Sequence, residues 1–254
     1  MSSPRISARG IRWFIALLVV SSSVLALMFW NPWVKREDYT PSAAIYDPLS
    51  EGGVGFSAEC SDLFKSAGYD VEVCSGGDVT VGGLKATPPG VDVLILRVHS
   101  SVYHGRVWFF TGETYRQEAY VLEQLLDEVH PARPSVGSDY LFAVGADFLL
   151  HYLDDSFDGT LVVLMGCDGL SSTDLAVAFI EAGASAYVSW DGPVSLEHTD
   201  RATLVLLRLL VEERVRLDEA VDRAMAEAGP DPDYGSSLKF TPEDAGSLVL
   251  GPSS

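Results

Sequence analysis

The sequence has little positive charge. Its 254 residues include 17 Lys and Arg but 36 Asp and Glu, which gives a formal net charge of -19 at pH 7. A protein of this sign repels phosphate backbones, so the composition argues against a nucleic-acid partner. Hydrophobic residues make up 47% and charged residues 21% of the chain, as in a folded globular protein. We therefore expect one domain of catalytic size with a full hydrophobic core.

Long apolar segments are also scarce, and a single one stands out. The run from Trp13 to Trp30 carries no charge and approaches the roughly 20 residues that a helix needs to cross a bilayer. Arg5, Arg9 and Arg12 precede it and should stay in the cytoplasm. The sequence thus predicts a transmembrane or signal anchor over residues 1–33, a linker over 34–42 and a domain over 43–254. The domain is expected outside the cell membrane, held by a single span.

A cleaved signal peptide is the alternative to this anchor. Val24-Leu25-Ala26 has the small-residue pattern of a signal-peptidase site, and cleavage there would give a secreted protein. The apolar run continues through Leu27, Met28 and Phe29, so we favour the uncleaved anchor.

Cysteine is rare, with three residues: Cys60, Cys74 and Cys167. An odd number in an exported protein favours one disulfide and one free thiol. Cys60 is early in the helix expected after the first strand, and Cys74 comes just after the second strand. Because parallel strands end at one edge of a sheet, we predict a Cys60–Cys74 disulfide and a free Cys167.

Signals for metals and nucleotides are missing from the sequence. No His or Cys spacing resembles a zinc site, and no glycine-rich loop after a strand matches the P-loop or dinucleotide fingerprints. We expect no catalytic metal and no other cofactor.

What the sequence does contain is an alternation of strand and helix patterns. This alternation predicts an α/β fold with a mostly parallel central sheet and helices on both faces. Strands are expected at 43–46, 69–73, 91–98, 160–165 and 185–190, with a hairpin or excursion strand at 106–110 and a short strand near 238–240. Helices are expected at 57–67, 117–129, 146–153, 174–182, 199–212 and 217–227.

His99 and Cys167 each follow a buried strand of this pattern. The carboxyl ends of parallel strands lie on one edge, so the two side chains can meet there although they are distant in sequence. An imidazole beside a thiol is the arrangement that activates a cysteine nucleophile. The other candidates for the base do not directly end a buried strand, and we read them as surface or loop residues: His104, His130, His151 and His198.

At these residues the sequence resembles the caspase-like cysteine peptidases, the group of caspases, metacaspases, legumain, gingipains, separase and CHAT domains. Their pattern is a hydrophobic strand ending in His and a small residue, then another ending in a small residue and Cys. Here these are LILRVHS, with His99-Ser100, and LVVLMGC, with Gly166-Cys167. The block STDLAVAFIEAGASAYVSWDGPVS resembles the helix, turn and strand that gingipains and CHAT domains place before the substrate pocket. The resemblance covers about residues 43–228 and implies a caspase-like three-layer sandwich.

The resemblance implies an endopeptidase in which His99 promotes attack of Cys167 on a peptide carbonyl, giving an acyl-enzyme that water hydrolyses. The oxyanion would be held by backbone N–H groups of Cys167 and Ser100. The family commonly has Gly where this chain has Ser100, so a need for positive φ at that position would disturb the oxyanion hole.

Specificity is predicted from Ser189-Trp190-Asp191, at the position of Ser-Trp-Arg in caspases. There the tryptophan helps form a subsite and the arginine binds an acidic side chain. With Asp191 in place of the arginine, we expect a pocket of Trp190 and Asp191 that favours Arg or Lys before the cut. Asp47 and Asp168, on the same predicted edge, would reinforce the negative field.

The sequence therefore predicts a membrane-anchored, extracytoplasmic cysteine endopeptidase that takes peptide or protein substrates. A catalytically silent caspase-like module that binds peptides or partners is the alternative, because one fold can host either role. The presence of both His99 and Cys167 favours the enzyme.

Overall fold

The computed structural model of the protein describes residues 39–50 and 55–251. The predicted anchor falls on residues 1–33, outside the described residues. No helix within the described ranges is long and apolar enough to span a bilayer.

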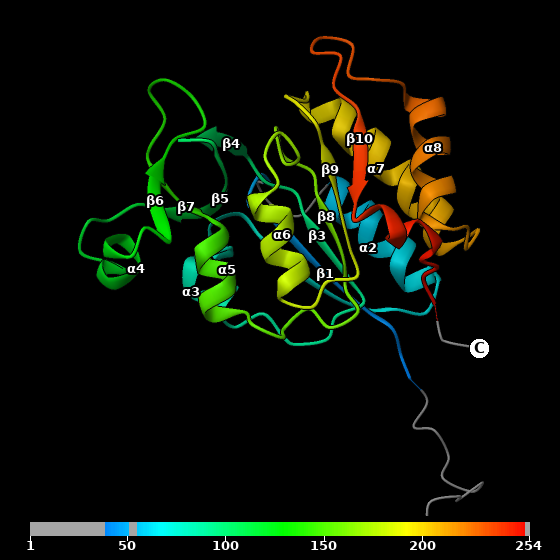
Figure 1. Ribbon diagram of the computed structural model, residues 1–254, viewed down its shortest axis with the longest axis horizontal. Coiled ribbons are helices and arrows are strands. Elements are labelled where there is room, and N and C mark those ends of the chain that lie inside the picture. The colour runs from blue at the N-terminus through cyan, green and yellow to red at the C-terminus, as the bar shows by residue number, and fades with distance from the viewer. Residues whose placement is uncertain (1–38, 51–54, 252–254) are drawn as a thin grey trace, which may run out of the picture. The chain divides into compact units, whose positions relative to one another are not determined.

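The core of the fold is a six-stranded sheet with strand order β10-β9-β8-β3-β1-β2 (Figure 1). Five strands run parallel, and β10 is antiparallel to β9 at one edge. The strands are β1 (Ser42–Asp47), β2 (Asp70–Ser75), β3 (Val93–Leu96), β8 (Leu161–Leu164), β9 (Ala186–Trp190) and β10 (Leu238–Thr241). The chain steps from β1 to β2 on one side and then to β3 on the other, so the strand order reverses between β1 and β3.

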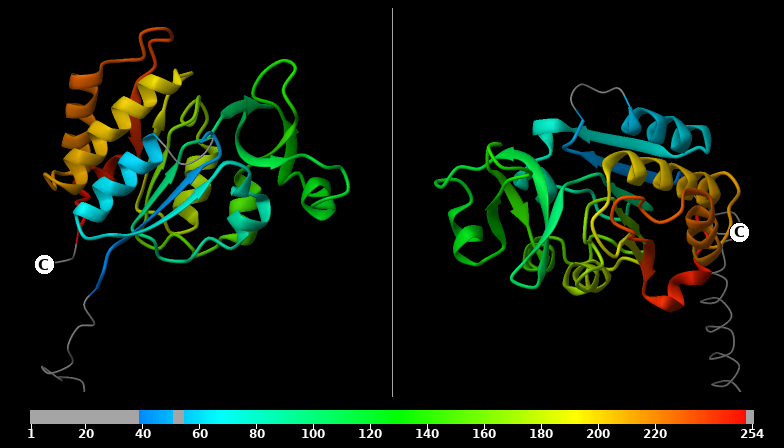
Figure 2. Two further views of the ribbon diagram at one scale, coloured as in Figure 1. Left: turned by 180° about the vertical axis from the view of Figure 1, so that it is seen from behind. Right: turned by 90° about the horizontal axis from the view of Figure 1, so that it is seen from above.

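Helices cover both faces of this sheet, as Figure 2 shows from behind and from above. One face packs against α2 (Phe56–Ser66), α7 (Leu196–Val211) and α8 (Leu217–Ala228). The other packs against α3 (Val81–Lys85), α5 (Ala146–Tyr152) and α6 (Asp174–Glu181). Side chains on a strand alternate between faces, so Ile45 and Ile95 enter the first cluster and Ala44 and Leu94 the second. The predicted three-layer α/β sandwich is confirmed.

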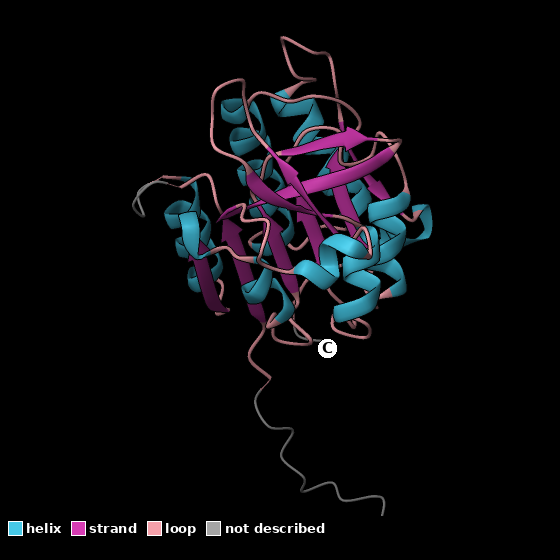
Figure 3. Cartoon of the chain, turned by 90° about the vertical axis from the view of Figure 1, so that its left-hand side faces the viewer, coloured by secondary structure: helices cyan, strands magenta, loops and turns pink. Residues whose placement is uncertain are grey.

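A second, four-stranded sheet packs beside the first and was mostly missed by the sequence patterns. Its antiparallel order is β4-β5-β7-β6, and it stands at one end of the molecule (Figures 1 and 3). The strands are β4 (Ser100–Tyr103), β5 (Arg106–Thr114), β6 (Val129–Ala132) and β7 (Leu141–Val144). One face closes the core with Val107, Phe109 and Val144. The hairpin expected at 106–110 is confirmed as β4 and β5.

The helix predicted over 117–129 is wrong for most of its length. Only α4 (Val121–Leu125) is helical, and Tyr120 before it has a left-handed backbone with φ 52°. Val129 belongs to β6, where it pairs with Val144 of β7. The apolar spacing is real, but Leu122 and Leu125 are 58% and 78% exposed, so no core-facing stripe exists here.

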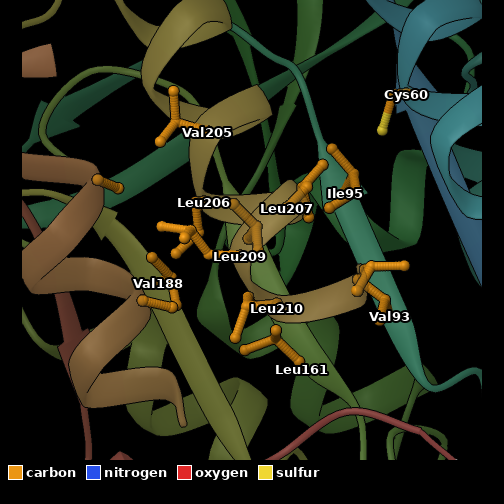
Figure 4. Close-up of a cluster of buried hydrophobic side chains, with 14 of the residues drawn as sticks. Cys60, Val93, Ile95, Leu161, Val188, Val205, Leu206, Leu207, Leu209 and Leu210 are labelled. Carbon is orange, nitrogen blue, oxygen red and sulfur yellow. The ribbon is translucent and has the colours of Figure 1, made fainter. Parts of the chain in front are cut away.

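The predicted Cys60–Cys74 disulfide is also wrong, since all three cysteines are free thiols. Cys60 on α2 is fully buried in the first cluster, where Figure 4 draws it with side chains of β3 and α7. Cys74 pairs with Tyr46 across β1 and β2 and packs with it in the second cluster. The two thiols therefore lie on opposite faces of the sheet. Sharing a sheet edge did not place them on the same face.

Candidate active site

His99 and Cys167 follow two neighbouring strands in matching register. Strands β3 and β8 are parallel partners, and Leu96 lies opposite Leu164 in the last aligned pair. His99 comes three residues after Leu96, and Cys167 three residues after Leu164. The two residues thus leave the sheet at the same height, beside the point between β1 and β3 where strand order reverses. Ligands of open α/β sheets commonly bind at such a point.

The segments that carry these two residues are in direct contact. The Ser100 hydroxyl donates to the backbone oxygen of Cys167 at 2.6 Å. Gly166 lies against the same segment, because a Cβ there would be 2.1 Å from the Ser100 Oγ and 2.8 Å from the Val98 oxygen. A glycine before Cys167 is therefore a packing requirement of this turn, as well as part of the sequence pattern.

Ser100 has an extended backbone conformation, which serine adopts without strain. It is not among the described non-glycine residues with positive φ, and it begins β4 in an extended conformation. The Phe110 N–H donates to the His99 oxygen at 2.8 Å, so Ser100 and Phe109 form a non-hydrogen-bonded pair of the ladder. The N–H of Ser100 consequently points away from β5, toward the free edge of β4. The substitution of Ser for the family's Gly costs no strain here.

The Cys167 thiol is half-buried and contacts the loop between β9 and α7. Its Sγ accepts from the Val194 N–H at 3.4 Å and lies 3.5 Å from the Val194 oxygen. Burial raises the pKa of the Cys167 thiol above its ordinary value, and the negative charges of Asp168 and Asp231 raise this pKa further. The hydrogen bond from the Val194 N–H lowers the pKa but does not outweigh these effects. These effects keep the Cys167 thiol neutral at rest, so it would need a base to act as a nucleophile.

His99 is suited to act as that base. Its side chain is exposed, and its ring centroid lies 6.2 Å from that of Phe110. Partial loss of hydration lowers the pKa of His99, and the charge of Arg97 lowers it further. A lowered pKa keeps the imidazole neutral and able to accept a proton at neutral pH.

Arg97 joins three elements beneath the site. Its Nη1 donates to Asp47 Oδ1 at 2.9 Å, at the end of β1. Its Nε and Nη2 donate to the two carboxylate oxygens of Asp200 on α7 at 2.8 and 2.9 Å. The guanidinium thus fixes the start of the segment that leads to His99.

Asp47 is not a pocket residue, contrary to the prediction. It is 1% exposed and pairs with Arg97. Its other oxygen accepts from the Ser57 hydroxyl at 2.5 Å. This carboxylate ties β1 to its neighbours and is out of reach of a substrate.

Trp190 also differs from the prediction, because it is fully buried. Its Nε1 donates to the Thr199 hydroxyl at 2.9 Å, within the core formed by β9 and α7. It supports the loop that follows β9 and does not form a subsite wall.

Asp191 directly follows β9, but its side chain is already paired with other residues of the chain. Its carboxylate accepts from the Ser237 N–H at 2.7 Å and from Lys239 Nζ at 2.7 Å. Burial would raise the pKa of Asp191, but the bonds from Lys239 and Ser237 outweigh it and lower the pKa overall. Its charge is compensated, so it is a weaker attractant for a basic side chain than the sequence suggested.

Asp168 is a half-exposed acid directly after Cys167. It has φ 60°, its N–H donates to the Gly192 oxygen at 2.9 Å, and its carboxylate accepts from the Ser171 hydroxyl at 2.8 Å. The positive φ turns the chain sharply directly after Cys167.

Asp231, which sequence reasoning missed, holds the neighbouring loop in place. It is 2% exposed and accepts from both the N–H and the hydroxyl of Ser195 at 2.9 Å. It also accepts from the N–H groups of Asp233 and Tyr234 at 2.9 and 3.0 Å. Arg97 and Val194 were missed as well. Nothing in their local sequence signals them, because Arg97 meets residues far away in the chain and Val194 acts through its backbone.

Three of the other histidines have partners elsewhere, and the reading of His198 as a surface or loop residue is wrong because it is buried on α7. His198 lies buried between Gly229 and Arg201, at 3.0 Å from each, and His130 and His151 pair with Asp127 and Glu128. Within the described ranges no group of His, Cys, Asp and Glu side chains could hold a metal ion.

Comparison with solved structures identifies the fold. The Arg-specific cysteine proteinase gingipain R superposes with a TM-score of 0.50 at 14% identity, covering 82% of this chain and 47% of that one. The chain has a caspase-like fold. A complex of the pro- and mature domains of the same proteinase from Porphyromonas gingivalis aligns with a TM-score of 0.46 at 13% identity. This caspase-like chain spans less than half the length of the gingipain structures. No family model and no curated protein matches the sequence.

Proposed function

We propose that this protein is a cysteine endopeptidase in which Cys167 is the nucleophile and His99 the general base. The observation that carries the proposal is the matched position of the two residues after β3 and β8, with their segments joined by the bond from Ser100 to the Cys167 oxygen. The caspase-like fold supports it. The proposed location is outside the cell membrane, with residues 1–33 as the anchor.

In the proposed reaction, neutral His99 takes the thiol proton as Sγ attacks the peptide carbonyl. The N–H groups of Ser100 and Cys167 stabilise the oxyanion, and collapse of the tetrahedral intermediate releases the amine as it takes the proton from His99. Water then attacks the thioester with His99 again as base, and the thiol is regenerated.

A basic residue before the scissile bond fits this site best. The gingipain R structure is that of an Arg-specific proteinase. Here Asp168 and Asp231 place negative charge near Cys167, whereas Asp47 and Asp191 are compensated by Arg97 and Lys239. We assign the preference to Asp168, because it is half-exposed and no cation within the described ranges pairs with it.

The test is covalent labelling of the full-length protein with a thiol-reactive peptide probe that carries Arg at the position before the reactive group. We expect labelling of the wild type and of Cys74→Ala, a control that removes another half-buried thiol, and none of Cys167→Ala. Cleavage of an Arg peptide should fall at least about a thousandfold in Cys167→Ala and in His99→Ala.

Two results would contradict this proposal. Equal labelling of Cys167→Ala would place the reactive thiol elsewhere, and an unlabelled wild type would favour the silent binding module. For specificity, Asp168→Asn should lower the preference for Arg over Gln by about tenfold, with Asp191→Asn as the matched control. A larger loss of the preference for Arg in Asp191→Asn than in Asp168→Asn would indicate that Asp191 selects the basic residue.

A further inference from the structure

The second sheet has a hollow face that the proposed chemistry does not use. A cavity of about 320 Å³ lies on the side of the sheet opposite to Val107 and Phe109, over Trp108 and Ala143. Arg133 and Tyr140, from the loop between β6 and β7, form its rim, and the Arg133 guanidinium lies 5.2 Å from the Tyr140 ring centre. This loop projects beyond the sheet at the upper left of Figure 1.

The cavity offers donors and aromatic surface but no carboxylate. Trp108 is 3% exposed, and its Nε1 is buried without a hydrogen-bond acceptor. Its six-membered ring rests against Gly145, where a Cβ would be 2.7 Å from Cζ3, so the N–H edge of the indole is turned away from Gly145. The other lining residues are Ser101, Tyr103, His130, Pro131, Ala132, Arg133, Tyr140 and Ala143.

Arg133 makes this cavity unusual in so acidic a chain. Within residues 39–50 and 55–251 no carboxylate pairs with it, and none lines the cavity. An aromatic side chain flanked by acceptor groups matches such a lining, because the ring stacks on tyrosine and guanidinium while carbonyl oxygens accept from N–H groups.

Strand β4 connects this cavity to the candidate active site. It begins with Ser100, directly after His99, and is an edge strand of the second sheet. Ser100 and Val102 occupy non-hydrogen-bonded positions opposite β5, so their N–H and C=O groups face the free edge. Ser101 lies between these two residues and Tyr103 follows them, and both line the cavity. An extended peptide could pair with this edge as an added strand while one of its side chains enters the cavity.

The proposed roles of His99 and Cys167 indicate which part of a substrate would lie along β4 and in the cavity. His99 must donate its proton to the leaving amine, so the peptide that follows the scissile bond departs past His99. We propose that the edge of β4 and the Trp108 cavity bind this leaving segment, with an aromatic side chain about two to four residues beyond the scissile bond in the cavity. The inference rests on the proposed peptidase function and adds a specificity site on its leaving-group side.

The test uses quenched fluorescent peptides that share one sequence before the scissile bond and carry Phe, Ala, Lys or Asp at each of several positions after it. A coumarin amide with the same first half has no residues after the scissile bond and serves as the reference substrate. We expect Phe to raise kcat/KM about tenfold over Ala at one position. In Arg133→Ala, Tyr140→Ala and Trp108→Phe this ratio of Phe to Ala should approach one.

Arg116→Ala is the matched control, because Arg116 is an exposed arginine, 62% accessible, outside the cavity. It should keep the full ratio of Phe to Ala. N-methylation of the peptide amides that face β4 should lower kcat/KM for the long peptides. Equal rates for Phe and Ala at every position, or a ratio unchanged in all three cavity variants, would overturn the inference.

Binding separates a failure of this inference from a failure of the proposed function. The peptide that follows the scissile bond is titrated calorimetrically into Cys167→Ala and into Cys167→Ala/Arg133→Ala. Binding that depends on Arg133, without cleavage by the wild type, would support the cavity as a peptide site and reject the peptidase. Cleavage by the wild type without such binding or preference would reject the cavity alone.

Discussion

At the scale of single residues, the two proposed reacting groups rest in their neutral forms. The pKa of the Cys167 thiol is raised and that of His99 is lowered, each mainly by loss of hydration. In the proposed mechanism the proton would therefore move during attack, in contrast to a preformed pair of thiolate and imidazolium. Such a thiol is inert until a substrate carbonyl and the base are both in place.

This arrangement predicts the pH dependence of activity. Protonated His99 cannot accept the thiol proton, so kcat/KM falls as the pH drops through its pKa. Because that pKa is lowered, the acid limb should lie below about pH 6.5, the ordinary value for histidine. Profiles of kcat/KM against pH for an Arg peptide measure the limb.

Alkylation of His99→Ala by iodoacetamide provides the second half of the test. Without the base, the rate should rise only above about pH 8.5, the ordinary thiol pKa. A rate in His99→Ala that is already maximal at neutral pH would reveal a preformed thiolate and contradict this account.

The sequence predicted that His99 and Cys167 lie at one edge of the sheet, but it did not predict the surroundings of these two residues. Their position could be predicted from a local pattern, because each comes three residues after the end of a buried aliphatic strand. Asp47 and Trp190 were misassigned because their burial depends on partners on other elements, Arg97 for the first and Thr199 for the second. The sequence can predict that a residue lies at the edge of a sheet. It cannot predict whether the side chain of that residue is free or already paired with another residue.

At the scale of elements, Arg97 couples β1, β3 and α7 through two carboxylates. Asp47 is buried, and the side chain of Asp200 is 24% exposed. Removing the guanidinium leaves the Asp47 charge uncompensated in the interior. Loss of one partner of a buried ion pair costs far more than loss of an exposed one.

We therefore expect Arg97→Met to lower the free energy of unfolding by about 3–5 kcal/mol. The control is Arg208→Met, which removes an exposed 3.0 Å pair with Glu59 and should cost at most about 1 kcal/mol. Urea unfolding followed by tryptophan fluorescence gives both values. Adding Asp47→Asn to Arg97→Met should recover part of the loss, and equal costs for the two arginines would refute the role of Arg97.

The elements that the sequence predicted best are those whose burial follows from their own pattern. Strands β3 and β8 carry continuous aliphatic runs and α7 has a broad apolar stripe, so the sequence placed these elements within a few residues. The second sheet was missed because β4, β6 and β7 have four residues each and β6 contains Pro131. Pairing with β7 took Val129 into a strand against its helical spacing, a tertiary override of a local pattern.

At the scale of the whole molecule, the predicted membrane anchor on residues 1–33 determines where the proposed peptidase would act. The uncharged run from Trp13 to Trp30 behind Arg5, Arg9 and Arg12 predicts one span with the domain outside. This orientation would hold the proposed peptidase at the outer surface of the membrane. The excess of acidic residues, which gives the whole chain a net charge of -19, would then keep the domain away from anionic headgroups.

Carbonate extraction of membranes from expressing cells tests the anchor. Full-length protein should remain in the pellet, because about 20 apolar residues hold a span against high pH. Replacing both Leu18 and Val19 by Arg should release it, since each charge at the centre of a span costs about 2.5–3.5 kcal/mol of insertion. The matched control is Val136→Arg, at a position in the domain that is 95% exposed, and it should stay in the pellet. Wild-type protein in the supernatant would reject the anchor, and mass spectrometry would then distinguish an intact chain from one cleaved after Ala26.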